Sequence, residues 1–361
     1  MDNIIGILGS SGTVGRHVAA YLLEKGYTVC GAQRRQTEEF ADNENFTQQK
    51  VDIGSQAELT EFCKKCRYII NCIAPSFIYG EKVAKTAAEN GCIYIDLTDA
   101  VMDKKLPEGG VYVTSCGYIP GLSAYLPMMV GRKYFDKVYS VTEIQGGNEI
   151  CSANALIDII LSSEVSGKGD MFYSNGSTEH ISLNIGKRYK LPFFDNEVFL
   201  KPYISHELVH LAEREEINCF RWFNVYENME QFAFILKMVS LFAKTGSDEL
   251  SDVIRKECDK RRKALNEEIH AVFGAELIGS KDGIEKCVRY VLDVHDSSVL
   301  CGITAAVIAE QVIENGAPVG KSYGYLFIPE DFIEKISGYL SEGERFEITF
   351  HTTNEAFTAE L

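Results

Sequence analysis

A glycine-rich turn between an apolar run and a helical pattern, at residues 4–16, constrains the fold of this chain more than any other feature. The segment reads Ile-Ile-Gly-Ile-Leu-Gly-Ser-Ser-Gly-Thr-Val-Gly-Arg. The first two turn glycines permit a tight turn and the close approach of a pyrophosphate, and the third permits close packing of helix on strand. The start of the helix supplies backbone amides for an anion. We therefore predict a dinucleotide-binding site made of Gly9, Ser10, Ser11, Gly12, Thr13, Val14 and Gly15.

β-rich runs and helical patterns alternate over the first third of the chain, which is typical of a parallel sheet built from βαβ units. They predict strands at residues 3–8, 28–32, 46–51, 68–72, 93–96 and 111–115, and helices at 17–24, 55–63 and 80–90. Beyond residue 121 the pattern predicts longer strands at 137–146, 189–200, 216–224 and 286–295, and helices at 153–161, 230–242, 248–270 and 302–314. The expected fold class is α/β, a Rossmann-type parallel sheet domain with a second α+β domain.

The end of the second predicted strand indicates the cofactor. An NAD site places an acidic residue there for the ribose 2′-hydroxyl, whereas this chain has Arg34 and Arg35, which favour a 2′-phosphate. We therefore predict NADP, and the alternative is that the two arginines form a solvated pair in a loop. Asp52, after the third predicted strand, is either an adenine contact or the cap of the next helix, a role for which Ser55 competes.

Charge and composition restrict the partners. The formal net charge is 36 minus 52, or −16, which repels nucleic acid and anionic membrane surfaces. No apolar run approaches the roughly 20 residues that span a bilayer, and the N-terminus lacks a basic secretory segment. The eleven cysteines follow no repeating spacing, as expected of reduced thiols. We expect a small-molecule substrate, no nucleic-acid or membrane partner, and a cytoplasmic location.

Three further segments resemble one protein family. Residues 70–81 followed by 94–99 resemble the fourth and fifth strand regions of saccharopine dehydrogenase-like NADP-binding oxidoreductases, a family that includes a trans-acting enoyl reductase branch. Residues 115–123 resemble the Gly-x-x-Pro-Gly segment with which that family leaves its Rossmann domain. A helix that starts at Gly302 and a Pro-Glu pair at Pro329 resemble the family's C-terminal part.

The resemblance implies a discontinuous first domain, because in the family the C-terminal helix packs back onto the nucleotide domain. We therefore expect a Rossmann domain over residues 1–122, completed by 301–361. Residues 123–300 would form an α+β domain for substrate binding and dimerisation, and the resemblance implies a homodimer.

The loops after the parallel strands should hold the reacting groups, because ligands of such sheets lie beyond the carboxyl ends of the strands. Ala74 and Pro75 should approach the nicotinamide. Asp96 and Tyr79 are candidates for a proton relay, although a loop cap explains Asp96 and simple packing explains Tyr79 equally well. We expect residues 74–79, 96–99 and 117–123 to converge in one pocket.

A turn at Pro120 and Gly121 would aim the next helix N-terminus at a substrate carboxylate, or else only connect the two domains. Tyr118, Pro120 and Gly121 are the candidate substrate-binding residues. The predicted activity is hydride transfer between NADP(H) and a C=N or C–N centre of an amino-acid-derived molecule. The alternatives are reduction of the C=C bond of an enoyl thioester, and a redox sensor that binds NADP(H) without turnover.

One short motif points to different chemistry. His206 and His210, with a glutamate between them, match His-Glu-x-x-His, which on a helix can bind zinc. The motif lacks a clear third ligand and a protease context, so we expect no metal. A Tyr-x-x-x-Lys pair at Tyr21 and Lys25 lies in the first predicted helix, too early for the catalytic pair of a short-chain dehydrogenase.

Overall fold

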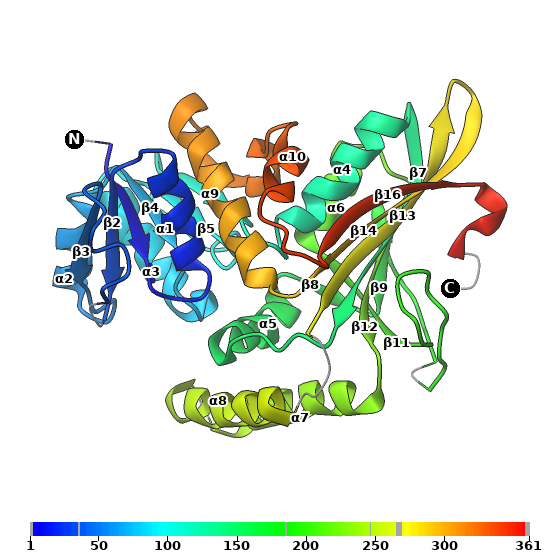
Figure 1. The fold of residues 1–361 in the computed structure, drawn as a ribbon, viewed down its shortest axis with the longest axis horizontal. Helices are drawn as coiled ribbons and strands as arrows, with labels where there is room; N and C mark the ends of the chain where they lie inside the picture. Colours follow the sequence, from blue (N-terminus) through cyan, green and yellow to red (C-terminus); the bar gives the residue numbers. More distant parts are fainter. Residues whose placement is uncertain (1–2, 35–36, 185, 246, 265–268, 358–361) are drawn as a thin grey trace. The chain divides into compact units, whose positions relative to one another are not determined.

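A computed structural model describes residues 3–34, 37–184, 186–245, 247–264 and 269–357 (Figure 1). The chain divides into two compact units. The first comprises Met1–Tyr125 and Ser297–Tyr339, and the second comprises Leu126–Asp296 and Leu340–Leu361. The prediction that residues 301–361 complete the first domain is therefore wrong for residues 340–361. These residues belong to the second unit because its edge strand β16 (Arg345–His351) pairs antiparallel with β14 (Ile284–Val294).

The first unit is built on a seven-stranded parallel sheet with the order β15-β6-β5-β4-β1-β2-β3. Five of its strands, β1, β2, β4, β5 and β6, are short and mostly buried runs, as expected of strands covered on both faces. The edge strands β3 and β15 are polar and partly exposed, and β15 was not predicted. The strands are β1 (Ile5–Leu8), β2 (Val29–Gln33), β3 (Phe46–Lys50), β4 (Tyr68–Asn71), β5 (Ile93–Asp96), β6 (Val111–Thr114) and β15 (Gly320–Tyr323). The predicted Rossmann-type parallel sheet is confirmed.

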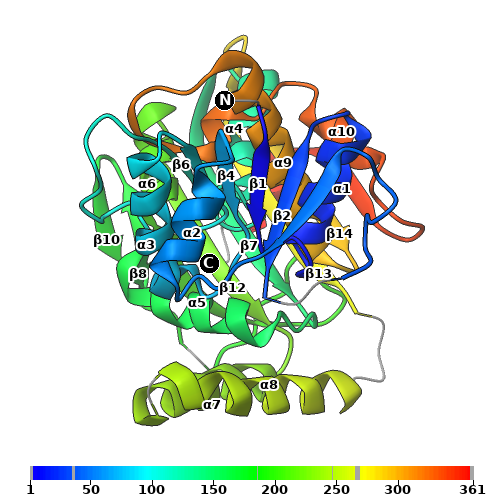
Figure 2. The same cartoon turned by 90° about the vertical axis from the view of Figure 1, so that its left-hand side faces the viewer.

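Helices cover both faces of this sheet, as Figure 2 shows. On one face α2 (Gln56–Cys63) and α3 (Ser76–Glu89) bury an apolar cluster against the sheet. On the other, α1 (Gly15–Glu24) packs against α9 (Ser297–Asn315). The Tyr21 hydroxyl on α1 donates to Glu310 Oε2 on α9 at 2.9 Å, so this tyrosine joins two helices. The short elements η1 (Gly324–Phe327) and α10 (Phe332–Ser337) complete the unit.

Helix α9 requires a correction to the expectation that no apolar run is long enough to span a bilayer. Within the described part of the chain it is one helix of sufficient length and apolarity, with 19 residues and a mean hydropathy of 1.4. The buried share of its apolar window is 61%. A core helix of a soluble protein passes the same test, and the packing of α9 on α1 fits that explanation.

The second unit is built on a mixed sheet in which β7 pairs parallel with β12 and antiparallel with β13. The predicted second α+β domain is therefore confirmed as a class. The further strands are β7 (Lys137–Gly147), β8 (Gly167–Gly169), β9 (Met171–Ser174), β10 (Ser177–His180), β11 (Phe199–Ser205), β12 (Cys219–Tyr226) and β13 (Ala271–Lys281). The helices are α4 (Leu122–Tyr134), which contains the boundary between the units, α5 (Ala153–Val165), α6 (His206–Arg214), α7 (Met229–Thr245), α8 (Ser247–Ala264) and the short η2 (Thr353–Glu355).

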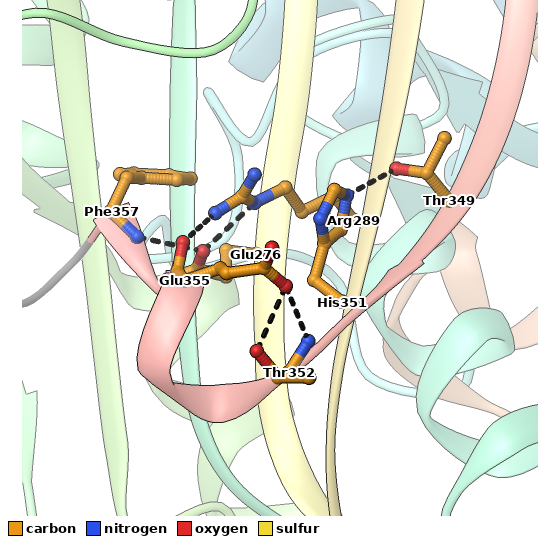
Figure 3. A network of polar contacts seen from close by, with 7 residues as sticks. All are labelled: Glu276, Arg289, Thr349, His351, Thr352, Glu355 and Phe357. Atoms are coloured by element: carbon orange, nitrogen blue, oxygen red, sulfur yellow. Dashed lines mark hydrogen bonds and ion pairs between the residues drawn. The ribbon is translucent and has the colours of Figure 1, made fainter.

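Buried charges anchor the C-terminal segment to this second sheet (Figure 3). Arg289 on β14 forms an ion pair with Glu276 on β13 at 2.9 Å, and also donates to the backbone carbonyl of Glu355. Glu276 Oε2 accepts a further bond from the backbone N–H of Phe357 at 3.0 Å. Because Glu276 is 1% exposed, these donors compensate the cost of burying its charge.

The prediction for this unit is wrong in one strand and incomplete in others. Residues 189–200 do not form one strand: Tyr189 and Val198 form an isolated bridge, and β11 starts only at Phe199. Pro192 lies in the middle of that run and cannot donate to a strand neighbour. Several elements of this unit were not predicted at all: the helix α6, the short strands β8, β9 and β10, the strand β16 and the 11-residue strand β13.

Candidate functional site

The strand order of the first unit defines where a ligand fits. β1 lies between β2 and β4, so the chain proceeds to one side after β1 and to the other side after β3. Open parallel sheets bind ligands in the crevice beyond the carboxyl ends of the strands at this change of direction. The loops after β1 and β4 meet there, since a Cβ atom on Gly9 would lie 3.0 Å from the carbonyl oxygen of Cys72.

The turn after β1 has the geometry of a phosphate cradle. Gly9 has φ +81°, which favours glycine, and Gly12 donates its N–H to the Gly9 carbonyl at 2.9 Å. A Cβ atom on Gly15 would lie 2.2 Å from that same carbonyl oxygen, so only glycine lets α1 start here. The backbone N–H groups of Thr13 and Val14 have no acceptor among the described residues. The predicted turn is therefore an open set of donors at a helix N-terminus.

The candidate adenosine contacts lie at the ends of β2 and β3. Arg34 directly follows β2 and is exposed, whereas Arg35 lies outside the described residues. Asp52 is exposed after β3, and its Oδ1 accepts from the Gly54 N–H at 2.8 Å. Ser55, not Asp52, caps α2 by accepting from the Glu58 N–H. Asp52 thus remains a predicted adenine contact without the capping role.

Asp96, at the end of β5, is fully buried and saturated with hydrogen bonds. Its Oδ2 accepts from Asn71 Nδ2 at 2.9 Å, from Ser76 Oγ at 2.8 Å and from the Tyr94 hydroxyl. Its Oδ1 accepts from the Thr98 N–H at 2.8 Å and from Thr98 Oγ1 at 3.0 Å. Burial, and then the neighbouring Asp96, raise the pKa of Tyr94 well above its usual value. This arrangement favours a positioning role for Asp96 over proton transfer.

The segment after β4 leads directly into α3. Pro75 is the buried N-cap residue of α3, with the half-buried Ala74 before it. The helix starts at Ser76, earlier than the predicted residue 80, so Tyr79 lies in its first turn rather than in a loop. Tyr79 is half-buried, and its hydroxyl has no hydrogen-bond partner within the described ranges. Of the two candidate proton donors, only Asp96 has its side chain fully engaged in hydrogen bonds within the protein.

The turn that leaves the sheet after β6 is closely packed. Gly121 has φ +122°, and a Cβ atom on it would lie 2.5 Å from the Gly117 carbonyl oxygen. The Gly117 N–H donates to the Pro120 carbonyl, and α4 starts at the next residue, Leu122. Tyr118 is buried in the same turn. A Cβ atom on Gly324, in η1, would lie 2.7 Å from the Ser115 carbonyl oxygen, so the C-terminal part of the unit packs on this turn.

Hydrogen bonds connect two of the three predicted segments, and the third lies beside them. Ser76 binds Asp96, which joins residues 74–79 to 96–99. The N–H groups of Ser115 and Cys116, just before the third segment 117–123, donate to the carbonyls of Thr98 and Asp96, and a Cβ atom on Gly117 would lie 3.0 Å from the Leu97 carbonyl oxygen. Sequence reasoning missed the buried partners Asn71, Ser76 and Tyr94, since no spacing rule connects them. The ligand that these segments hold stays a prediction.

The His-Glu-x-x-His motif lies on α6, with Ser205 as its N-cap. His206 is exposed, whereas Glu207 is 0% exposed and faces the interior of the second unit. Burial lowers the pKa of His210. Across the residues that the structure describes, there is no cluster of three or more His, Cys, Asp or Glu side chains that could hold a metal ion.

Comparisons with known proteins agree with the architecture of the first unit. Residues 5–115 match the model of the saccharopine dehydrogenase NADP binding domain, which confirms the predicted resemblance and NADP as the cofactor type. A saccharopine dehydrogenase-like oxidoreductase of Mus musculus is 30% identical over 101 residues, which is 26% of this chain and 24% of that protein. A lipid droplet localized protein of Caenorhabditis elegans is 27% identical over 137 residues, 31% of this chain and 32% of that protein. The chain thus spans a third or less of the curated relatives it matches.

One solved structure resembles the chain as a whole. The apo saccharopine dehydrogenase (L-Glu forming) of Saccharomyces cerevisiae has a TM-score of 0.66, covering 97% of this chain and 100% of that one. The sequence identity is 12%, so this likeness shows the fold alone.

The names of two relatives contradict the expected cytoplasmic location. One is the lipid droplet localized protein, and the other is a probable mitochondrial saccharopine dehydrogenase-like oxidoreductase of Arabidopsis thaliana, 25% identical over 140 residues, 31% of each chain. The expectation is wrong because it used net charge, cysteine spacing and the lack of a secretory segment, none of which separates the cytoplasm from an organelle or a lipid droplet.

Proposed function

We propose that this chain, whose residues 5–115 are an NADP-binding domain of the saccharopine dehydrogenase type, is an NADP(H)-dependent oxidoreductase. The observation that carries the proposal is the turn between β1 and α1. A Cβ atom would fill its cradle at Gly15, and the N–H groups of Thr13 and Val14 face no acceptor within the described chain. A dinucleotide pyrophosphate fits such a cradle.

The substrate we propose is an amino-acid-derived molecule that reacts at a C=N or C–N centre. Its support is the fold likeness, over nearly the full chain, to a solved saccharopine dehydrogenase of the L-Glu-forming type. Tyr118, Pro120 and Gly121 stay our candidate substrate-binding residues. The first N–H groups of α4 are not open donors, because those of Leu122–Tyr125 donate to the carbonyls of Gly117, Tyr118 and Gly121, so other groups would have to hold a substrate carboxylate.

Each group of the site has a proposed role. The bound dinucleotide supplies the hydride acceptor or donor. Thr13 and Val14 would hold its pyrophosphate, Arg34 its 2′-phosphate, and the Ala74-Pro75 segment would limit the position of its nicotinamide. The Tyr79 hydroxyl is our candidate for holding the proton at the substrate nitrogen, and Asp96 positions the loops around it.

The test is turnover with a panel of substrates. The purified chain is incubated with NADPH and imines of amino acids with 2-oxo acids, and with enoyl thioesters, while absorbance of the reduced cofactor is followed. In the reverse direction, NADP⁺ is offered with opines. We expect turnover only with the nitrogen compounds and a large loss of kcat in Tyr79→Phe. Turnover only with enoyl thioesters would replace the proposal by a C=C reductase, and cofactor binding without turnover would replace it by a sensor.

We also propose a homodimer, in line with the resemblance. Light scattering of the pure protein should give a mass near twice 40.3 kDa. A mass near 40.3 kDa at micromolar concentration would contradict it.

A further inference from the structure

A buried glutamine ends β2, next to the phosphate cradle. Gln33 is 8% exposed, and Ser10 Oγ, in the turn after β1, donates to its Oε1 at 2.9 Å. Gly31, two residues earlier on the same face of the strand, leaves room for that hydroxyl, since a Cβ atom there would lie 2.5 Å from Ser10 Oγ. With Oε1 bonded to Ser10, Nε2 is the other end of the Gln33 amide.

The donor end of that amide has no protein acceptor. Gln33 Nε2 is buried, and none of the residues in the described ranges accepts a hydrogen bond from it. Buried polar groups in folded proteins are nearly always paired, because an unpaired donor destabilises the fold. A ligand acceptor would satisfy this nitrogen.

The position of Gln33 identifies the ligand atom. In parallel sheets that bind NAD, the residue at the carboxyl end of the second strand is acidic and accepts a hydrogen bond from the adenosine ribose 2′-hydroxyl. Gln33 occupies that end of β2, directly before Arg34. A glutamine has the shape of a glutamate but donates through Nε2 and carries no negative charge.

We infer that Gln33 is a specificity-determining residue of the cofactor site, whose Nε2 donates to the 2′-phosphate of NADP(H), and that Ser10 is its positioning residue. The inference rests on the proposed function. A carboxylate in place of this amide would repel the phosphate and accept from a 2′-hydroxyl instead. The single change from amide to carboxylate at Gln33 therefore decides between NADP(H) and NAD(H), with Arg34 adding to the phosphate affinity.

The experiment measures dissociation constants of NADPH and NADH by calorimetry, without turnover, for the full chain and three variants. Gln33→Glu should weaken NADPH and strengthen NADH, so that the preference for NADPH falls by about 10-fold or more, the effect of one charged hydrogen bond. Gln49→Glu is the matched control, because it adds the same charge on the adjacent strand β3, where Gln49 accepts from Lys65. Ser10→Ala should weaken NADPH by several-fold without strengthening NADH.

The outcomes separate the two proposals. Equal preference changes in Gln33→Glu and Gln49→Glu, or none in either, would overturn the role of Gln33 and leave NADPH binding intact. A wild-type chain that binds neither dinucleotide would overturn the proposed function and this inference together. If Gln33→Glu fails to fold, as thermal unfolding would reveal, Ser10→Ala decides: an unchanged NADPH-to-NADH ratio in this variant contradicts the inference.

Discussion

Replacing Asp96 by asparagine tests whether the buried network at the end of β5 positions the loops or transfers protons. The asparagine has the same shape but replaces one acceptor oxygen by an NH₂ group. With that group in place of Oδ2, Asn71 Nδ2 loses this acceptor and keeps only the hydroxyl oxygens of Ser76 and Tyr94. With that group in place of Oδ1, the Thr98 N–H loses its acceptor. Hydroxyls can reverse and accept, but these two N–H donors cannot.

The magnitude follows from this count. At least one hydrogen bond to the former carboxylate is lost, at about 1.5–3 kcal/mol, and the remaining bonds lose their charge assistance, so we expect a total of roughly 2–4 kcal/mol. For a compact unit of the size of the first one, the unfolding temperature should fall by roughly 4–16 °C. Differential scanning calorimetry measures this, with Asp103→Asn, at an exposed site on the same loop system, as the control.

A positioning residue also leaves a kinetic signature. In Asp96→Asn the pH profile of kcat/KM should keep its shape while the dissociation constant of NADPH rises, because the loops lose their geometry but no titrating group leaves the reaction. A variant with wild-type unfolding temperature and cofactor affinity but a kcat lowered by a thousandfold would refute this reasoning and restore Asp96 as a proton donor.

Further expectations concern the cofactor, a helix contact and a buried acid. Arg34→Ala should reduce the ratio of NADPH affinity to NADH affinity by about 10-fold or more. Equal affinities of the wild type for the two cofactors would contradict the role of Arg34 at the 2′-phosphate. Gly302→Ala should lower the free energy of unfolding by about 1–3 kcal/mol, because the new Cβ atom would lie 2.6 Å from His17 Cβ and 2.9 Å from the Val14 carbonyl oxygen, and an unchanged denaturant midpoint would contradict this packing. Burial raises the pKa of Glu143, which is 0% exposed. Glu143 therefore stabilises the folded state fully below its unfolded-state pKa of about 4.3, and this contribution is lost as the pH rises toward its higher folded-state pKa. The unfolding temperature of Glu143→Gln should consequently decline less than that of the wild type between pH 5 and 8.

Most strands of the first unit could be predicted from the sequence because they are buried on both faces, whereas the partly exposed edge strand β15 was missed. Such strands form short apolar runs with turn residues on either side, and residues 93–96, for example, form β5 with the predicted bounds. The glycine turn could also be predicted from the sequence, because Gly9 and Gly15 occupy positions that only glycine fits.

The second unit shows why other features escaped prediction. β13 was missed although Asp282 and Gly283, both with positive φ, form a two-residue hairpin turn to β14, for which an Asp-Gly pair is a strong signal. The networks of Asp96 and Gln33 could not be predicted, because Ser10 and Gln33 are 23 residues apart, and Asn71 and Ser76 are 25 and 20 residues from Asp96. Gln33 itself had a positional signal, the end of the second strand, which the adjacent arginines obscured.

The alternation of the two units along the chain has a consequence for synthesis on the ribosome. The first unit needs Ser297–Tyr339 for α9 and β15, and the second needs the residues from Leu340 onward for β16. When only the glycine turn and the strands up to β6 have emerged from the ribosome, the nascent chain still exposes the side of α1 where Tyr21 later contacts Glu310. During translation the first unit therefore stays incomplete until residues 297–339 have emerged. The second unit stays incomplete until β16 has emerged. Chaperone binding to stalled nascent chains should be strongest before residue 297 is released.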